Sequence, residues 1–200
     1  MIPKHIYIEN LQLAEKISGI SGCVVECGVW RGGMTAGMAR ILGSRRAYFL
    51  FDSFAGLPPA QEVDGENALA WQSNTQAPGY HDNCTASPEF ARQAMLRSGA
   101  TNFHLIEGWF NETLPKFVPP EPIALLRLDA DWYDSTMTCM ESLFDRVTPG
   151  GLIILDDYYA WDGCGRALHD FLSKRSATER IQSHGSVCFL EKKPKSNHPI

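Results

Sequence analysis

A strand, a glycine-rich turn and a helix follow one another in CVVECGVWRGGMTAGMARIL, residues 23–42. Cys23 to Cys27 form a short apolar run, which is typical of a strand buried on both faces. Gly28 allows a tight turn, and residues 34–42 combine helical spacing with good helix formers. A buried strand joined to a helix in this way predicts the first unit of an α/β fold.

The same alternation of apolar runs and helical patterns continues along the chain. Further strands are predicted at residues 47–51, 103–107, 123–128, 152–155 and 187–190, and further helices at 88–98, 135–147 and 165–175. The helix at 88–98 has the clearest start, with Ser87 as its N-cap and Pro88 in its first turn. Strands that alternate with helices form a mostly parallel sheet with helices on both faces.

The size and composition of the chain limit the number of domains, the partners and the cellular location that we expect. Its 200 residues predict a single domain. The net charge is −5, and an acidic chain is poorly suited to a phosphate backbone, so nucleic acid is not the expected partner. Because no targeting segment and no membrane-spanning run is recognisable, we expect a cytoplasmic protein without membrane contact. The six cysteines show no CxxC pair and no zinc spacing, so they are interpreted as reduced core residues.

One long stretch interrupts the alternation. Residues 53–87 contain several prolines and glycines and show no pattern from which an element can be predicted. A loop of that length in a compact domain is commonly a functional lid or disordered. It follows the second strand, so it should hang over the carboxyl edge of the sheet, where open α/β sheets bind ligands. We therefore predict an active-site lid at 53–87, and a flexible polar tail at 192–200.

The glycine turn and the end of the second strand together indicate a nucleoside cofactor. Gly32 and Gly33 let the backbone approach a ligand, and the helix N-terminus that follows favours an anion such as a carboxylate. Asp52 lies 24 residues after Gly28, a separation typical of an acidic residue that binds ribose hydroxyls. The turn lacks the G-x-G-x-x-G spacing of a nicotinamide site. Asp52 by itself does not distinguish NAD from S-adenosylmethionine (SAM), and an ordinary turn with a turn-forming aspartate stays an alternative.

Four aspartates follow two strands that we expect to be neighbours. Asp129 and Asp131 come after the strand at 123–128, while Asp156 and Asp157 come after the next one. Carboxylates crowded at one sheet edge repel each other unless a cation lies among them. Oxygen ligands without histidine or cysteine favour Mg²⁺ or Ca²⁺ over zinc. Helix capping could explain one or two of these aspartates but not all four, so the sequence predicts a divalent metal site.

Four segments at predicted strand ends resemble the macrocin O-methyltransferase family. They are GVWRGG (28–33), DSFAGLP (52–58), LLRLDADWY (125–133) and DDY (156–158). The likeness extends from about Glu26 to about Phe171. Members of that family methylate sugar hydroxyls of antibiotics such as macrolides and aminocoumarins. The resemblance implies a Rossmann-like class I methyltransferase fold, with a mostly parallel seven-stranded sheet containing one antiparallel strand, and Mg²⁺-assisted O-methylation by SAM.

The resemblance also implies roles for individual residues. Asp129, Asp156 and Asp157 match the metal ligands, and Asp131 matches the proposed general base. The residues expected to bind the cofactor are Glu26, Gly28, Arg31, Asp52, Ser53, Gly108, Trp109 and Asp129. Among these, Glu26 is expected near the methionine end of SAM and Asp52 at its ribose. For Arg31, pairing with the SAM carboxylate and solvation of a helix start are equally compatible with the sequence.

The expected acceptor is a small molecule with two neighbouring oxygens, because such a pair chelates Mg²⁺ better than a single oxygen does. The resemblance favours a sugar diol of a glycosylated natural product. A catechol-like aromatic is the main rival, and a Mg²⁺-dependent hydrolase or phosphotransfer enzyme on a similar fold is a further alternative. Family members usually have a longer N-terminal segment that helps to close the pocket and build a dimer. About twenty residues precede the first strand here, so the acceptor and a homodimer are both left open.

Overall fold

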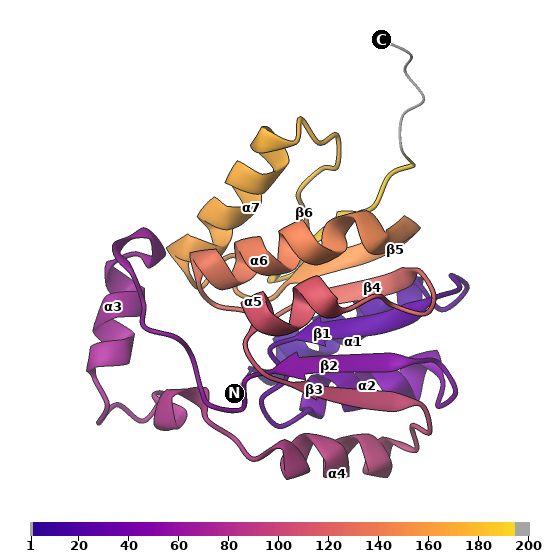
Figure 1. The fold of residues 1–200 in the computed structure, drawn as a ribbon, viewed down its shortest axis with the longest axis horizontal. Helices are drawn as coiled ribbons and strands as arrows, with labels where there is room; N and C mark the ends of the chain where they lie inside the picture. The colour runs from indigo at the N-terminus through magenta and orange to yellow at the C-terminus, as the bar shows by residue number, and fades with distance from the viewer. Residues whose placement is uncertain (1, 195–200) are drawn as a thin grey trace.

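A seven-stranded sheet forms the centre of the computed structural model, which describes residues 2–194 (Figure 1). Its strands are β1 (Cys23–Cys27), β2 (Tyr48–Asp52), β3 (Phe103–Glu107), β4 (Ile123–Leu128), β5 (Val147–Leu155), β6 (Gln182–His184) and β7 (Val187–Glu191). They lie in the order β3-β2-β1-β4-β5-β7-β6. Strand β7 is antiparallel to β5 and β6, whereas the other neighbouring pairs are parallel. The predicted mostly parallel sheet with one reversed strand is confirmed.

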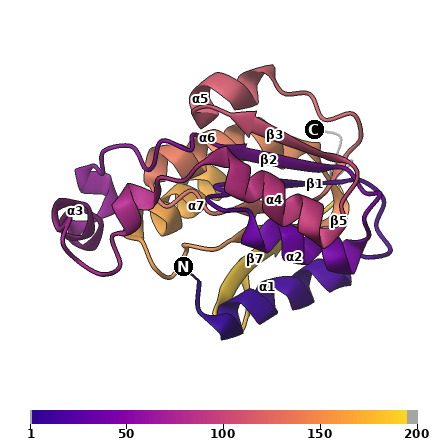
Figure 2. The ribbon, with the colours of Figure 1, turned by 90° about the horizontal axis from the view of Figure 1, so that it is seen from below.

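Helices cover both faces of this sheet (Figure 2). The α-helices are α1 (Lys4–Lys16), α2 (Gly33–Leu42), α3 (Glu66–Ser73), α4 (Pro88–Ser98), α5 (Phe110–Thr113), α6 (Tyr133–Leu143) and α7 (Asp162–Lys174). Short 3₁₀ helices are η1 (Glu62–Asp64), η2 (His81–Cys84), η3 (Leu114–Lys116) and η4 (Phe144–Arg146). Helices α1, α2 and α4 build one buried cluster with the sheet, and α6 and α7 build the other. Within residues 2–194, no helix has both the length and the apolarity needed to cross a membrane.

Strands β1 and β4 are buried along their whole length, and each carries a charged side chain inside an otherwise apolar run. Glu26 in β1 and Arg127 in β4 are partners in the parallel register. Side chains at paired positions of neighbouring strands emerge on the same face of a sheet. Both therefore face α1 and α2, beneath the carboxyl edge.

Most predicted elements are present, and the differences have local causes. The strands at 23–27, 103–107 and 123–128 and the helix at 88–98 have the predicted bounds. The helix predicted at 135–147 ends at Leu143 instead, because the chain turns through η4 and Val147 then pairs with Ile123 in β4. Helix α1 and the three-residue strand β6 were not predicted. All six cysteines are free thiols, in agreement with their interpretation as reduced.

The segment 53–87 contains secondary structure that its sequence pattern does not reveal. It forms η1, α3 and η2, and Figure 1 shows α3 beyond the carboxyl ends of the strands. Helix α3 buries only Ala68, so it lacks the apolar stripe that identifies a surface helix. The four residues of η2 all have positive φ angles, between 48° and 61°. The sequence pattern therefore did not reveal these elements, although the segment lies over the sheet edge as expected.

Lys192, the first residue of the flexible tail predicted at 192–200, packs against the sheet. Lys192 is buried, and its ammonium donates a hydrogen bond of 3.1 Å to Glu179. Its backbone also pairs with Gly150 and Gly151 in β5. These contacts fix Lys192 against the sheet, and residues 195–200 of the predicted tail lie outside the described part of the chain.

Candidate active site

Two adjoining cavities open at the carboxyl edge of the sheet. The first, of about 570 Å³, lies against the ends of β2 and β3 and the start of α6. The second, of about 350 Å³, lies between the N-terminal segment, the 53–87 segment and the ends of β4 and β5. The two cavities share part of their walls, namely Gly28, Asp52, Gly56, Leu57 and Asp129. A ligand in one cavity can therefore meet a ligand in the other near these residues.

Gly28 brings the turn after β1 against the end of β4. Its φ angle is +87°, and a Cβ atom built there would lie 1.7 Å from the carbonyl oxygen of Asp129. No side chain fits that space. The glycine is thus required by the close approach of two backbones, and it places Asp129 at the boundary between the cavities.

Asp52 at the tip of β2 holds the glycine turn in place. One carboxylate oxygen accepts hydrogen bonds from the backbone N–H groups of Val29 (2.7 Å) and Trp30 (2.6 Å), and the other accepts from Phe54 (2.7 Å). Trp30 and Phe54 have φ angles of +48° and +53°, which are unfavourable for residues with a side chain. The Asp52 carboxylate thus stabilises two strained loops while it also lines both cavities, a role that the sequence spacing did not indicate.

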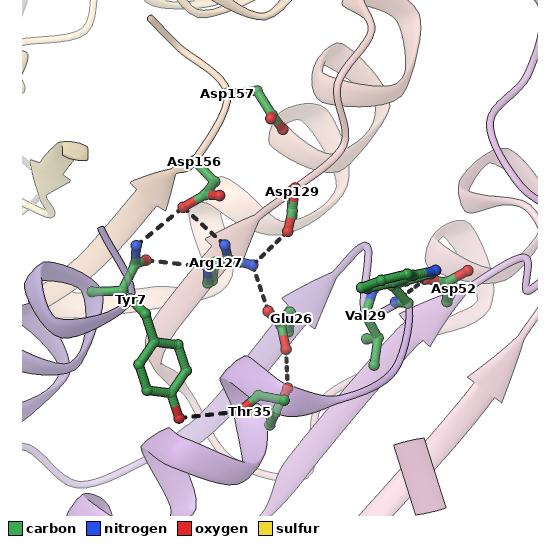
Figure 3. Close-up of polar contacts among 12 residues, drawn as sticks. Tyr7, Glu26, Val29, Thr35, Asp52, Arg127, Asp129, Asp156 and Asp157 are labelled. Carbon is green, nitrogen blue, oxygen red and sulfur yellow. Dashed lines mark hydrogen bonds and ion pairs between the residues drawn. The ribbon is translucent and has the colours of Figure 1, made fainter. Parts of the chain in front are cut away.

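A buried arginine lies beneath the aspartate cluster. The Arg127 side chain is 1% exposed, and its guanidinium contacts Glu26 (2.5 Å), Asp129 (2.9 Å) and Asp156 (2.8 Å), as Figure 3 shows. Thr35 in α2 donates its hydroxyl to the other Glu26 oxygen. Sequence reasoning assigned no role to Arg127. The signal was its place inside an apolar strand, since a buried charge needs partners.

The three predicted metal ligands lie together. Asp129, Asp156 and Asp157 each offer a carboxylate oxygen, and these oxygens lie within 4.8 Å of one another. Asp157 is buried, and one of its oxygens accepts a 3.1 Å hydrogen bond from the backbone N–H of Asp131. Among residues 2–194, Arg127 is the one cation that pairs with Asp129 and Asp156.

The fourth aspartate, Asp131, lies beside this group on the wall of the smaller cavity. Its φ angle is +55°, and one carboxylate oxygen accepts a 3.0 Å hydrogen bond from the indole N–H of Trp161. Burial and then the neighbouring Asp129 carboxylate raise the pKa of Asp131 to about 8. Asp131 is thus oriented toward the cavity by contacts on both its backbone and its side chain.

The electrostatics of the cluster favour a cation. Burial and nearby carboxylates raise the pKa of Asp157 well above its ordinary value, and burial is also the main cause of the raised pKa of Asp129. Burial raises the pKa of Glu26 to about 7 even though Arg127 is adjacent. Repulsion of this kind is relieved by a positive ion. The donor atoms are carboxylate oxygens, so the residues present fit a hard divalent ion such as Mg²⁺.

The residues expected to bind the cofactor do not all lie at the cavities. Gly28, Asp52, Ser53, Gly108, Trp109 and Asp129 line the larger one. Glu26 lines neither cavity, because Arg127 and Thr35 enclose its carboxylate. Arg31 also lies apart, with its guanidinium 4.5 Å from the ring centre of Trp30 and 5.0 Å from that of Phe90.

Aromatic side chains that are not among the predicted site residues contribute to the smaller cavity. Trp30, Trp71, His81 and Trp161 line it together. The rings of Trp71 and Trp161 pack edge to face, 6.0 Å apart, and those of Trp30 and His81 lie 5.9 Å apart. The buried indole N–H of Trp30 has no hydrogen-bond partner among the described residues. Trp161 closely follows Asp156 and Asp157 in the sequence, whereas Trp30 comes from the glycine turn and Trp71 from α3.

The mostly parallel sheet with one reversed strand, and the cavity over its carboxyl edge beside the glycine turn, define a class I SAM-dependent methyltransferase. The family model "Macrocin-O-methyltransferase (TylF)" matches residues 7–192. The chain belongs to this family and is a SAM-dependent O-methyltransferase. Membership removes the alternative of a Mg²⁺-dependent hydrolase or phosphotransfer enzyme.

Named relatives agree with this assignment. The chain is 34% identical over 188 residues to the 8-demethyl-8-(2,3-dimethoxy-alpha-L-rhamnosyl)-tetracenomycin-C 4'-O-methyltransferase of Streptomyces olivaceus, covering 87% of this chain and 68% of that protein. It is 32% identical to the mycinamicin III 3''-O-methyltransferase of Micromonospora griseorubida, covering 82% and 65%. The structure of the O-methyltransferase NovP is similar, with a TM-score of 0.78 and 25% identity over 94% of this chain and 79% of that one. The chain thus spans about two thirds of the curated relatives' length.

Proposed function

We propose that this enzyme methylates one hydroxyl of a sugar diol on a small-molecule natural product, with Mg²⁺ bound by Asp129, Asp156 and Asp157. The observation that carries the proposal is the position of the aspartate cluster, on the walls of the smaller cavity and at its boundary with the larger one. A sugar acceptor is supported by the name of the Streptomyces olivaceus relative, which includes a rhamnosyl group.

The cavities suggest where the two substrates bind. SAM fits the larger cavity, where Asp52 and Ser53 lie at the end of β2 and Gly108 and Trp109 at the end of β3. The acceptor fits the smaller one, whose tryptophans offer flat apolar surfaces beside convergent carboxylates. Asp129 lines both, so the transferred methyl group would pass close to it.

The reaction is a single displacement. The bond between the methyl carbon and the SAM sulfur breaks, its electron pair stays on sulfur, and the acceptor oxygen bonds to the methyl carbon. A bound Mg²⁺ would supply polarisation of the acceptor oxygens and a lower hydroxyl pKa. The cavity walls hold donor and acceptor in line, an arrangement that can supply roughly 7–11 kcal/mol.

Asp131 is proposed to take the proton that the acceptor hydroxyl loses. Its carboxylate lies in the acceptor cavity, and it is not one of the three carboxylates that share the candidate metal position. The N–H of Trp161 holds one of its oxygens, so the other is the natural proton acceptor.

Methyl transfer from labelled SAM tests this function. We expect labelled product with rhamnosides that carry a free vicinal diol, no product with the matching monodeoxy sugars, loss of activity in EDTA and recovery with Mg²⁺. Methylation of catechol but of no sugar diol would overturn the acceptor class. Full activity in EDTA would overturn the metal while leaving the acceptor class intact.

A further inference from the structure

Helix α1 contributes one polar side chain to the acidic cluster. Asn10 is fully buried, although an asparagine is usually exposed. Its amide nitrogen donates hydrogen bonds to Asp156 (3.0 Å) and to the carbonyl oxygen of Ile6 (3.0 Å). Its amide oxygen accepts a hydrogen bond of 3.1 Å from Nε of Arg127. Both amide donors of Asn10 and its acceptor oxygen are therefore engaged.

Asn10 and Arg127 contact the same carboxylate oxygen of Asp156. Oδ1 of Asp156 accepts from the Asn10 amide and also contacts the guanidinium of Arg127 at 2.8 Å. Arg127 likewise contacts only Oδ2 of Asp129, at 2.9 Å. Each of these two aspartates is thus held through one oxygen, and Figure 3 shows both carboxylates gathered around Arg127 with Asp157 on the far side.

The orientation of the Arg127 guanidinium depends on the group that accepts the hydrogen bond from its Nε atom. The guanidinium is planar, so fixing Nε fixes where the two terminal nitrogens point. Asn10 holds Nε from α1, and Glu26 holds a terminal nitrogen from β1 at 2.5 Å. Without Asn10, the Arg127 guanidinium loses one of these two contacts, and the Asp156 carboxylate loses a hydrogen-bond donor.

We propose that Asn10 is a positioning residue of the metal site. It orients Arg127 and Asp156 so that the remaining oxygens of Asp129 and Asp156 face the ion together with Asp157. The inference rests on the proposed Mg²⁺ site. It goes beyond that site because it assigns a function to a helix that supplies no metal ligand. Groups that hold metal ligands in orientation typically change metal affinity about 10- to 100-fold when they are lost.

Calorimetric titration of the full chain with Mg²⁺ tests the proposal, with S-adenosylhomocysteine affinity and thermal unfolding measured in parallel. The test variant is Asn10→Leu, which keeps the side-chain size and removes every hydrogen bond. Gln12→Leu is the matched control, because Gln12 lies on the same helix but bonds to His184, away from the cluster. Leu13→Ala is a second control, since it loosens the buried face of α1 without touching the polar network.

Asn10→Leu should bind Mg²⁺ about 10- to 100-fold more weakly and bind S-adenosylhomocysteine normally. Both controls should keep the Mg²⁺ affinity of the unaltered chain. Unchanged Mg²⁺ affinity in Asn10→Leu would overturn the inference, as would an equal loss in Leu13→Ala. If the unaltered chain binds no Mg²⁺, the metal site itself is wrong, an outcome that is recognisable without any variant. If Asn10→Leu does not fold, Asn10→Ala removes the same hydrogen bonds without adding branched bulk and carries the same expectations.

Discussion

At the residue scale, the site depends on buried charged side chains, whose burial is costly unless each charge lies next to an opposite one. Arg127 is fully buried among Glu26, Asp129 and Asp156. Removing one partner from such a buried group typically costs about 3–5 kcal/mol, because the remaining charge is left without compensation. The same contacts orient Asp129 and Asp156 toward the candidate metal position. The arrangement therefore serves both the stability of the sheet and the geometry of the cluster.

Asp131→Asn tests whether Asp131 takes the proton of the acceptor hydroxyl. The amide cannot accept the hydroxyl proton as a carboxylate does, so the turnover rate should fall about 10²- to 10⁴-fold. The binding of Mg²⁺ and of S-adenosylhomocysteine should stay normal, because Asp131 is not part of the three-aspartate group. Single-turnover methylation and calorimetry give the two readouts.

Asp162→Asn is a suitable control for this substitution. Asp162 follows Trp161, is exposed, pairs with Arg166 at 4.0 Å and lines neither cavity. Its replacement removes the same charge near the site without removing the proposed base. Full activity of Asp131→Asn with normal metal affinity would show that another group takes the proton.

At the element scale, the 53–87 segment is anchored to the domain at defined points. Buried Asp64 in η1 accepts hydrogen bonds from the backbone N–H of Tyr133 at the start of α6 (2.7 Å) and from that of Gln61 (2.8 Å). The indole of Trp132 donates to the carbonyl oxygen of Pro58 (2.9 Å). Through these bonds, the segment holds Trp71 in the wall of the acceptor cavity.

Asp64→Ala should detach η1 from α6 and displace the wall that carries Trp71. We expect the KM for the acceptor to rise, while the affinity for S-adenosylhomocysteine stays unchanged because Asp64 and Trp71 do not line the larger cavity. Loss of such a helix-start hydrogen bond should lower the free energy of unfolding by about 0.5–2 kcal/mol. Steady-state kinetics and denaturant unfolding measure these effects.

The exposed Glu62 in the same 3₁₀ helix provides the control. Glu62→Ala removes the same charge, and within residues 2–194 the Glu62 side chain makes no hydrogen bond to α6, so the KM of this variant should equal that of the unaltered enzyme. An acceptor KM that is also unchanged in Asp64→Ala would show that the anchor does not shape the acceptor cavity.

At the scale of the whole molecule, the cavities exist because distant segments meet at one sheet edge. The end of β7 is held in this assembly by the buried pair of Lys192 and Glu179, with the Lys192 ammonium also 4.0 Å from the ring centre of Phe144. Burial alone would raise the pKa of Glu179, but backbone hydrogen bonds and Lys192 outweigh it and lower the pKa below its ordinary value of 4.5.

The sign of the pH effect follows from that lowered pKa. Because the folded chain binds the Glu179 proton less tightly than the unfolded chain, the pair stabilises the fold above about pH 4.5. That contribution is lost as the pH falls through the folded-state pKa. Glu179→Gln should therefore lower the free energy of unfolding by about 3 kcal/mol at pH 7, since it leaves Lys192 buried without its counter-charge.

The difference in unfolding free energy between Glu179→Gln and the unaltered chain should shrink as the pH drops below about 4.5. Urea unfolding at a series of pH values measures it. Glu141→Gln is the control, because its partner Lys174 is exposed and such surface pairs contribute little. A difference that does not vary with pH would contradict the role assigned to the Glu179 carboxylate.

The sequence by itself determined the sheet, the reversed strand implied by its family motifs, and the meeting of Asp129, Asp156 and Asp157. The strands and the meeting of the aspartates follow from local information, because continuous apolar runs specify buried strands and parallel strands bring their carboxyl ends to one edge. The reversed strand was implied by the family resemblance alone. Only the tertiary structure decided the roles of Asn10, Arg127 and Trp71. Each depends on contacts between segments far apart in the chain, such as the bond from Arg127 to Asn10. Helix α3 escaped prediction because it buries only Ala68 and has no apolar stripe. Helix α1 does place apolar residues on its buried face, among them Ile6 and Leu13, but this pattern was not recognised.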